Sequence, residues 1–307
     1  MRIIFMGTPE FAAESLKQLY SSGHDIAGVF TQADKPRNRG MKMSFSPVKE
    51  LALAHGIPIY QPVTLKDGIA AGIIKDLQCE LICVVAYGKL LPAEILKIPP
   101  LGCINIHGSI LPKYRGASPV QHAILNGEKE TGVTSMYLVE EMDAGDILFV
   151  KKTVINDDET SSALLTRLGV IGAQLLCETV DAMSRGEIKR LPQNHNEASY
   201  APLLTKDMSP IDWTQSAYMI KCKVRGLQPW PAATMNLDGN IVKVFSVDIT
   251  GQSHGKRPGS IVSAGLQGIE VACSDGSVTV KELQAPGGKR MSAADFLRGN
   301  RIRMDFV

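Results

Sequence analysis

The chain has 307 residues, of which 44% are hydrophobic and 21% are charged. This length favours two domains, and the composition is that of a globular protein that buries a core. The formal net charge is only +2, which excludes a protein that is basic throughout and leaves local patches for any nucleic-acid contact. The six cysteines form no Cys-x-x-Cys pair, so we expect reduced structural thiols and no metal site.

The chain begins with a strand-like segment, Arg-Ile-Ile-Phe-Met-Gly, so we expect no targeting segment before it. The longest apolar run, residues 81–87, is too short to cross a bilayer. We therefore expect a cytoplasmic protein that does not contact a membrane, and we expect it to be a monomer.

The first half of the chain alternates apolar runs of strand length with segments of helix length. This alternation is typical of a parallel sheet with helices on both faces. The expected strands are 2–6, 26–31, 58–60, 81–86 and 104–107, and the expected helices are 9–20, 47–55, 66–76 and 118–125. Two further strands, 131–139 and 147–155, are expected to pair around an acidic loop, before a long helix over 159–183.

The second part of the chain has a different pattern. Residues 186–206 are rich in Asn, Pro and small polar residues and lack a period, which indicates a linker. A helix over 216–224 is then followed by short strands separated by Gly and Asp-Gly turns, as in a small barrel. Those strands are 234–237, 241–249, 260–262, 269–273 and 278–283.

The fold class is therefore α/β. We expect a Rossmann-like parallel sheet in an N-terminal catalytic domain, residues 1–189, and a small OB-like β-barrel in a C-terminal domain, residues 207–307. Residues 190–206 are expected to link the two. The C-terminal domain carries 12 Lys and Arg against 9 Asp and Glu, which favours it as the part that contacts a polyanion.

The segment over residues 102–112 is the strongest candidate for chemistry. Asn105 and His107 alternate with two isoleucines, which is the period of a strand, so both polar side chains point to one face. Gly108 ends the strand, and the ends of strands in open α/β sheets are where ligands bind. An amide donor beside an imidazole suits chemistry on a carbonyl, because one group stabilises an oxyanion and the other moves protons.

An acidic turn over residues 140–146 offers a partner for the imidazole. A carboxylate within reach would orient His107 and favour its charged form. Acidic residues in a turn are more often solvated, and the pattern alone leaves both interpretations open. The candidates are Glu140, Glu141, Asp143 and Asp146.

Three segments in this order resemble the signature of the folate-dependent formyltransferases: Asn105-Ile-His107, residues 109–116 and residues 142–145. The resemblance implies that Asn105, His107 and Asp143 are the catalytic triad. It also implies that 10-formyltetrahydrofolate is the co-substrate, without a metal. The folate-binding residues it implies are Tyr87, Gly88 and Leu90 in one loop and Ser109, Ile110, Leu111 and Pro112 in the other.

Further segments resemble those members of the family whose acceptor is initiator methionyl-tRNA. They are residues 5–11, the basic loop 35–42, residues 200–206 and residues 211–213. The resemblance implies formylation of the methionine α-amino group, as used in translation initiation. Four cations in eight residues can follow a phosphate backbone, and a loop after the second strand lies at the sheet edge of Asn105. The tRNA-binding residues predicted in this loop are Lys35, Arg37, Arg39 and Lys42.

The C-terminal domain is expected to add affinity for tRNA, and Trp230 is expected to anchor its core. Its candidate phosphate contacts are Lys221, Lys223, Arg225, Lys243, Lys256, Lys281, Lys289 and Arg290. Two kinds of alternative stay open. One is the same chemistry on another acceptor: a sugar-nucleotide amine, glycinamide ribonucleotide or water. The other is an RNA-binding protein with an inactive enzyme fold.

Overall fold

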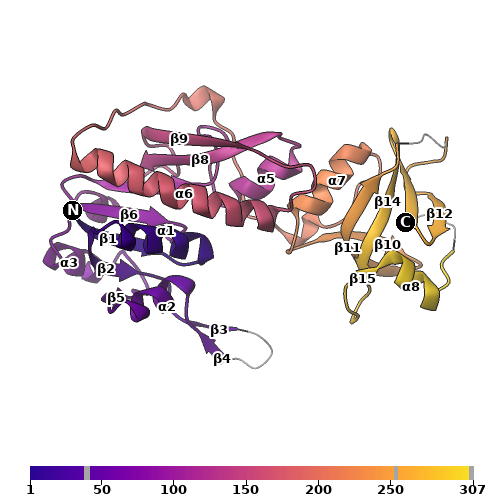
Figure 1. The fold of residues 1–307 in the computed structure, drawn as a ribbon, viewed down its shortest axis with the longest axis horizontal. Helices are drawn as coiled ribbons and strands as arrows, with labels where there is room; N and C mark the ends of the chain where they lie inside the picture. The colour runs from indigo at the N-terminus through magenta and orange to yellow at the C-terminus, as the bar shows by residue number, and fades with distance from the viewer. Residues whose placement is uncertain (38–41, 252–254, 304–307) are drawn as a thin grey trace. The chain divides into compact units, whose positions relative to one another are not determined.

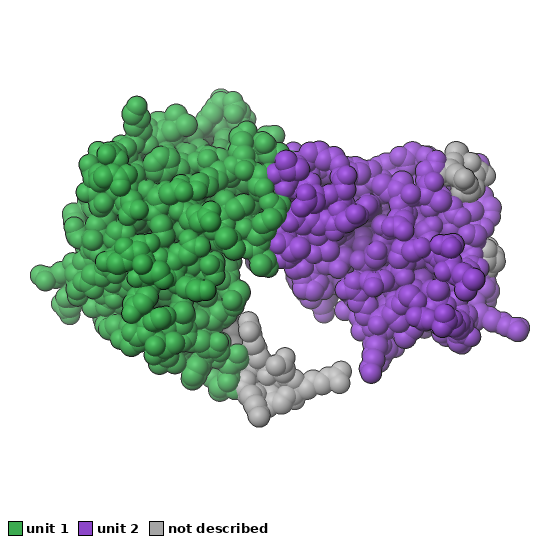
Figure 2. All heavy atoms as spheres, viewed as in Figure 1, with its two compact units in different colours: residues 1–119, 130–153, 165–201 green, residues 120–129, 154–164, 202–307 purple. Residues whose placement is uncertain are grey.

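The computed structural model describes residues 1–37, 42–251 and 255–303, without the side chains of residues 35–37 and 42. The described chain forms two compact units, coloured separately in Figure 2. Unit 1 comprises residues 1–119, 130–153 and 165–201, and unit 2 comprises residues 120–129, 154–164 and 202–307. Unit 2 therefore includes two short segments that come before residue 186 in the chain.

Unit 1 is built on a seven-stranded sheet whose strand order is β5-β2-β1-β6-β7-β8-β9 (Figure 1). The pairs from β5 to β7 are parallel, and β8 is antiparallel to β7. The predicted parallel sheet is confirmed, with an antiparallel pair added at one edge. The strands are β1 (Arg2–Gly7), β2 (Asp25–Phe30), β5 (Ile59–Tyr60), β6 (Leu81–Val85), β7 (Cys103–His107), β8 (Glu130–Tyr137) and β9 (Ile147–Val154).

Helices cover both faces of this sheet, because its central strands carry apolar side chains on both sides. On one face, a Cβ atom added at Gly172 of α6 would lie 2.9 Å from Ile106 of β7 and 3.6 Å from Phe11 of α1. On the other face, α3 and α4 join a core that includes Ile4 and Val84. The helices of unit 1 are α1 (Glu10–Ser21), α2 (Pro47–Ala54), α3 (Ile69–Asp76), α4 (Ala93–Leu96) and most of α6 (Ser161–Ser184). Helix α5 (Pro119–Leu125) belongs to unit 2 except for its first residue.

Helix α6 is long and apolar enough to cross a membrane by length and composition alone. Half of its most apolar window is buried inside the protein, including Leu168, Leu175 and Leu176. Core helices of globular proteins meet the same criterion of length and composition. The buried residues of α6 show that its apolar face packs within the protein.

Unit 2 contains an antiparallel sheet in the order β10-β11-β14-β13-β12, with β15 paired to β14 (Figure 1). Its core is apolar and includes Ile220, Val244, Ile269, Val280 and Leu283, all at most 1% exposed. The elements are α7 (Ala217–Gly226), β10 (Ala233–Leu237), β11 (Asn240–Ile249), β12 (Ile261–Gly265), β13 (Gly268–Cys273), β14 (Gly276–Gln284), β15 (Met291–Ser292) and α8 (Ala293–Gly299). The five predicted strands are all present.

Trp230 is 52% exposed, so the prediction that it anchors the core is wrong. Trp213 is the tryptophan of the unit 2 core, at 7% exposed. The hairpin of β3 (Lys35–Arg37) and β4 (Lys42–Ser44), which starts in the basic loop and ends two residues beyond it, was not predicted from the sequence. Strands of three residues are too short to show a period.

The aperiodic segment over 186–206 has only two short 3-10 turns, at His195–Glu197 and Lys206–Met208. It is nevertheless held firmly as far as residue 201. The backbone of Leu191 exchanges two hydrogen bonds with Ile147, of 2.8 and 2.9 Å, and Arg115 bonds to both Ser199 and Ala201. Hydrogen bonds to other parts of unit 1 therefore order this segment up to residue 201, although it has no periodic pattern.

Candidate active site

Asn105 and His107 lie at the C-terminal end of β7, on the face opposite Ile106. Asn105 pairs with Val84 of β6 and with Met136 of β8, so it stands inside the sheet rather than at its edge. Its side chain is partly exposed, and it has no hydrogen-bond partner among the described residues. The two amide N–H groups of Asn105 are thus free to donate to a ligand.

His107 is 6% exposed, and both of its ring nitrogens face a partner. Nε2 lies 2.8 Å from the carbonyl oxygen of Tyr114, and because a carbonyl only accepts, Nε2 carries a hydrogen. Nδ1 lies 3.6 Å from Oδ2 of Asp143. The bond from Nε2 to the backbone carbonyl fixes the ring, and the carboxylate of Asp143 faces its other nitrogen.

Asp143 reaches this position from the turn between β8 and β9. Its φ is +52°, a conformation that costs a non-glycine residue about 1–3 kcal/mol. The backbone N–H of Gly116 donates to its Oδ2 over 2.7 Å, and the side chain is 14% exposed. Two residues later, a Cβ atom at Gly145 would lie 1.9 Å from the carbonyl oxygen of Tyr137, so only glycine fits. The structure thus brings together the three residues predicted from the sequence.

The other acidic residues of this turn differ from Asp143 in their surroundings. Glu141 is exposed and lies 3.3 Å from Nη1 of Arg115, whose side chain is fully buried. Arg115 was not predicted as a site residue, although it lies in a segment that carried the family resemblance. Gln193 was also missed. It is buried and donates to the carbonyl oxygens of Asp143 and Gly145 over 2.8 and 2.7 Å. A single buried Gln in an aperiodic segment leaves no local sequence signal.

The first predicted folate-binding loop has one buried and two outward-facing positions. Tyr87 is 1% exposed, its hydroxyl has no partner among the described residues, and burial raises its pKa to about 12. Gly88 has a φ of +81°, and a Cβ there would lie 2.3 Å from the side-chain amide nitrogen of Gln32. Leu90 is 68% exposed. Leu90 is thus the side chain that this loop presents outward, whereas Tyr87 packs in the core of the unit.

The second predicted folate-binding loop is closed by its own hydrogen bonds. Ser109 is fully buried and donates through Oγ to the carbonyl of Lys113 over 2.6 Å. Leu111 packs with Met136, and Thr134 donates to the carbonyl of Ser109 over 2.7 Å. Ile110 and Pro112 are partly exposed. The side chains of Ser109 and Leu111 therefore shape the loop from inside.

Of the four cations predicted in the basic loop, Arg39 lies outside the described residues. Lys35 and Arg37 lie in β3 and Lys42 in β4, and only their backbone is described. Behind the hairpin, Lys49 Nζ donates to Asp34 over 2.5 Å and to Gln61 over 2.9 Å. These bonds from the ammonium and from the Gln61 amide hold the pKa of Asp34 below its usual value. The start of the hairpin is thus anchored to α2.

In unit 2, one predicted phosphate contact is wrong. Arg225 is only 6% exposed, and its guanidinium donates to the carbonyls of Asn156 and Glu159 over 2.9 and 3.1 Å. Its charge serves the packing of unit 2. Lys243 and Lys289, in contrast, are exposed and have no ion-pair partner among the described residues. Lys281 lies 3.8 Å from Asp248, and Arg290 pairs with Glu282.

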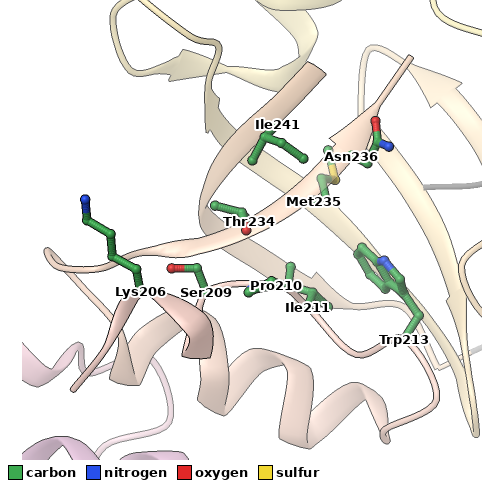
Figure 3. A pocket seen from close by; sticks show the side chains of 9 residues that line it. All are labelled: Lys206, Ser209, Pro210, Ile211, Trp213, Thr234, Met235, Asn236 and Ile241. Atoms are coloured by element: carbon green, nitrogen blue, oxygen red, sulfur yellow. The ribbon is translucent and has the colours of Figure 1, made fainter. Parts of the chain in front are cut away.

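Unit 2 also has a hollow of about 440 Å³ beside β10, shown in Figure 3. Its lining residues are Lys206, Ser209, Pro210, Ile211, Trp213, Thr234, Met235, Asn236 and Ile241. Lys206 is the one ionisable side chain in this lining. The hollow therefore lacks the imidazole and the carboxylate that lie 3.6 Å apart at the end of β7.

Comparison with known proteins gives a consistent result over both units. Residues 1–180 match the formyl transferase family, and residues 203–301 match the formyl transferase C-terminal domain. The methionyl-tRNA formyltransferase of Alkaliphilus oremlandii is 47% identical over 98% of this chain and 97% of its own length. That of Clostridium novyi is 43% identical over 100% of this chain and 99% of its own.

Among solved structures, the N-formyltransferase from Helicobacter canadensis, in complex with folinic acid and dTDP-3-aminofucose, superposes with a TM-score of 0.71. It is 18% identical and covers 91% of this chain and 98% of its own, so the likeness is one of fold. The sequence relatives carry the finer assignment, because they align along almost the full length at 43% to 47% identity. The chain belongs to the formyl transferase family, and within that family to the methionyl-tRNA formyltransferases.

Proposed function

We propose that the site at the end of β7 transfers the formyl group of 10-formyltetrahydrofolate to the α-amino group of initiator methionyl-tRNA. The observation that carries this proposal is the convergence of a free carboxamide, an imidazole and an aspartate on one strand end. Asn105 has two unused donors, and His107 lies 3.6 Å from Asp143. Full-length similarity to methionyl-tRNA formyltransferases supports the choice of acceptor.

The chemistry requires no covalent intermediate with the enzyme. A free α-amino group titrates at about 7.7–8.0, so a useful fraction is neutral at cellular pH and can attack the formyl carbon. The new C–N bond creates a tetrahedral carbon with an oxyanion, and the bond from that carbon to N10 of the folate then breaks. The attacking amine loses a proton, and N10 gains one.

Each of the three residues has one role in these steps. Asn105 donates an N–H to the formyl oxygen as negative charge develops on it. His107 acts as an imidazolium beside the same oxygen. Its Nε2 is occupied by the carbonyl of Tyr114, so the Nδ1 edge is left for the reacting groups. Asp143, whose Oδ2 lies 3.6 Å from Nδ1, orients that edge and receives the proton that the amine releases.

Folate binding is assigned to the two loops that flank this site. These loops contribute Tyr87, Gly88 and Leu90 on one side and residues 109–112 on the other. The complex of the Helicobacter canadensis enzyme with folinic acid supports a folate donor for this fold.

Binding of the tRNA is assigned to two basic regions. The basic segment of residues 35–42, with Lys35, Arg37, Arg39 and Lys42, contacts the acceptor end of the tRNA. The exposed cations of residues 207–307 contact its phosphates, and residues 190–206 join this region to the catalytic region, residues 1–189. We also propose that the enzyme is a cytoplasmic monomer without membrane contact. Similarity to methionyl-tRNA formyltransferases supports the cytoplasmic location.

The decisive experiment is formyl transfer with purified protein and 10-formyltetrahydrofolate. We expect formyl-methionyl-tRNA to form with charged initiator tRNA. We expect no product with a dTDP-amino sugar or glycinamide ribonucleotide, and no formate release without an acceptor. Preferential transfer to the sugar nucleotide, or release of formate, would replace the proposed acceptor. Absence of transfer to every acceptor would favour an RNA-binding protein without activity.

A further inference from the structure

Gln193 makes every hydrogen bond that a carboxamide can make, although it lies in a segment without regular structure. Its Nε2 donates to the carbonyl oxygens of Asp143 and Gly145 over 2.8 and 2.7 Å. Its Oε1 accepts from Nε and Nη2 of Arg115 over 3.2 and 2.8 Å. Gln193 is 6% exposed and Arg115 is 0% exposed, so water does not compete for these bonds.

The orientation of this amide is unambiguous. Arg115 has only donors and never loses its proton, so it must face the amide oxygen. The two carbonyls only accept, so they must face the amide nitrogen. The buried guanidinium also lies 3.3 Å from Glu141 and 3.4 Å from Nδ1 of His195, which completes its surroundings. The Gln193 amide therefore has a single hydrogen-bonded state.

The segment that carries Gln193 is itself tied to unit 1 on both sides. Before it, Leu191 exchanges two backbone bonds with Ile147 at the start of β9. After it, Ser199 accepts the backbone N–H of Arg115 over 2.8 Å and, through Oγ, that of Tyr114 over 2.9 Å. Gln193 is thus presented to the Asp143 turn from a fixed backbone.

We propose that Gln193, held by Arg115, is a positioning residue that sets the place of the Asp143 carboxylate in the formyl-transfer site. The inference rests on the proposed function. Asp143 lies in a left-handed conformation with a φ of +52°, which the turn would leave if its carbonyl were released. Its carboxylate is 3.6 Å from Nδ1 of His107, so a small shift separates the two groups. Gln193 touches neither substrate nor the reacting atoms in this assignment.

Two variants separate the loop contact from the Arg115 contact. Gln193→Met keeps the size of the side chain and removes all four hydrogen bonds. Gln193→Glu keeps the acceptor for Arg115 but places a carboxylate oxygen against two carbonyl oxygens. For both variants we expect kcat to fall by about 10- to 100-fold, because a misplacement of about 1 Å costs a reaction about that much. KM for both substrates should change by less than about threefold, since positioning acts on the transition state.

The pH profile of Gln193→Glu is a readout that a merely structural role would not change. Once protonated, the carboxyl group can donate to one of the two carbonyls, so its activity relative to wild type should rise as the pH falls. The matched control is Asn196→Ala, because Asn196 is exposed on the same segment and its side chain has no bond to the described residues. We expect this variant to keep wild-type kcat.

Hydrogen exchange of residues 141–146, followed by mass spectrometry, tests the contact without relying on activity. Exchange of these residues should be faster in Gln193→Met than in the wild type, and unchanged in Asn196→Ala. Unchanged exchange, unchanged kcat, or full activity of Gln193→Glu at neutral pH would each overturn the positioning role. Failure of the wild type to formylate any acceptor would instead overturn the proposed function, and the exchange result would still decide whether Gln193 holds the turn.

Discussion

In unit 1 the buried His and Arg side chains of the described residues gather at the end of β7, whereas in unit 2 the buried Arg joins separate segments of chain. His107 and Arg115 face an aspartate and a glutamate on the β8–β9 turn. Arg225 donates instead to backbone carbonyls of residues 156 and 159. The buried side chains of His107 and Arg115 therefore face other ionisable groups in unit 1. In unit 2, the buried guanidinium of Arg225 is bonded to backbone carbonyls.

The charged side chains near the surface also differ between the two units, in their exposure and in their bonding. Around the end of β7, the carboxylate of Asp143 is 14% exposed and bonded to a backbone N–H. In unit 2, Lys243 and Lys289 are exposed. A bonded charge orients a small reacting group, and a mobile ammonium suits a long polyanion. The proposed function therefore assigns catalysis to unit 1 and affinity for the nucleic acid to unit 2.

The largest effect should follow from removing the free carboxamide in unit 1. Asn105→Ala is expected to lower kcat by about 10²- to 10³-fold, as loss of one oxyanion donor does. The thermal midpoint should not change, because no described residue bonds to this side chain. Steady-state formylation of methionyl-tRNA and thermal unfolding measure the two quantities.

The matched change in unit 2 is Asn240→Ala, which removes an exposed carboxamide from the start of β11. We expect this variant to formylate at the wild-type rate. Equal rate losses in the two variants would remove the distinction between the units. A near-normal kcat for Asn105→Ala would exclude the proposed role of Asn105.

A smaller effect is expected from crowding the catalytic turn. In Gly145→Ala the new Cβ would lie 1.9 Å from the carbonyl of Tyr137, so the turn must move and take Asp143 with it. We expect a loss in kcat of about 100-fold, together with a lower thermal midpoint. The control is Gly72→Ala in α3, where a Cβ meets nothing within 4 Å. That variant should gain about 0.5–1 kcal/mol in stability and keep full activity, and any rate loss in it would show that glycine replacement alone disturbs the site.

Most of the fold could be predicted because its signals are local. The runs at 2–6 and 81–86 are apolar on both faces, and α2 and α7 begin at Ser46 and Ser216, whose hydroxyls accept from Lys49 and Met219. Helix α8 was missed although Ser292 caps it in the same way, because its seven residues are too few for a period.

The site could be predicted only in part. Asn105 and His107 share a strand, so the period of two placed them together, whereas Asp143 needed the family resemblance to be chosen among four acids. Gln193 could not be found, because its contacts join positions 50 and 48 residues apart. The role of such a side chain depends on contacts made by the tertiary fold, and no local sequence pattern predicts these contacts.

A third comparison separates the two kinds of cation within unit 2. Arg225→Met should lower the free energy of unfolding by about 1–3 kcal/mol, because the carbonyl of Glu159 loses its guanidinium donor. It should leave unchanged the slope of log Kd for tRNA against log salt. Lys289→Gln should leave the free energy of unfolding unchanged. It should make the slope of log Kd against log salt shallower by about one, as loss of one phosphate contact does. Chemical unfolding and filter binding at several salt concentrations measure both. A shallower slope in Arg225→Met would return Arg225 to the set of phosphate contacts.

The last expected effect is absent at neutral pH and concerns the thiols buried in the sheet of unit 1. Burial raises the pKa of Cys103 from its ordinary value of 9.0 to about 12. The unfolded chain therefore ionises this thiol near pH 9 while the folded chain does not, so stability is complete below pH 9 and falls as the pH rises above it. The expected fall is about 1.4 kcal/mol for each pH unit between 9 and 11. In Cys103→Ala, urea unfolding should show a slope against pH that is shallower by this amount, and no change in slope below pH 8. Identical slopes in variant and wild type would mean that the Cys103 thiol ionises as readily in the folded protein as in the unfolded chain. The start of β7 would then stabilise a thiolate in spite of its burial.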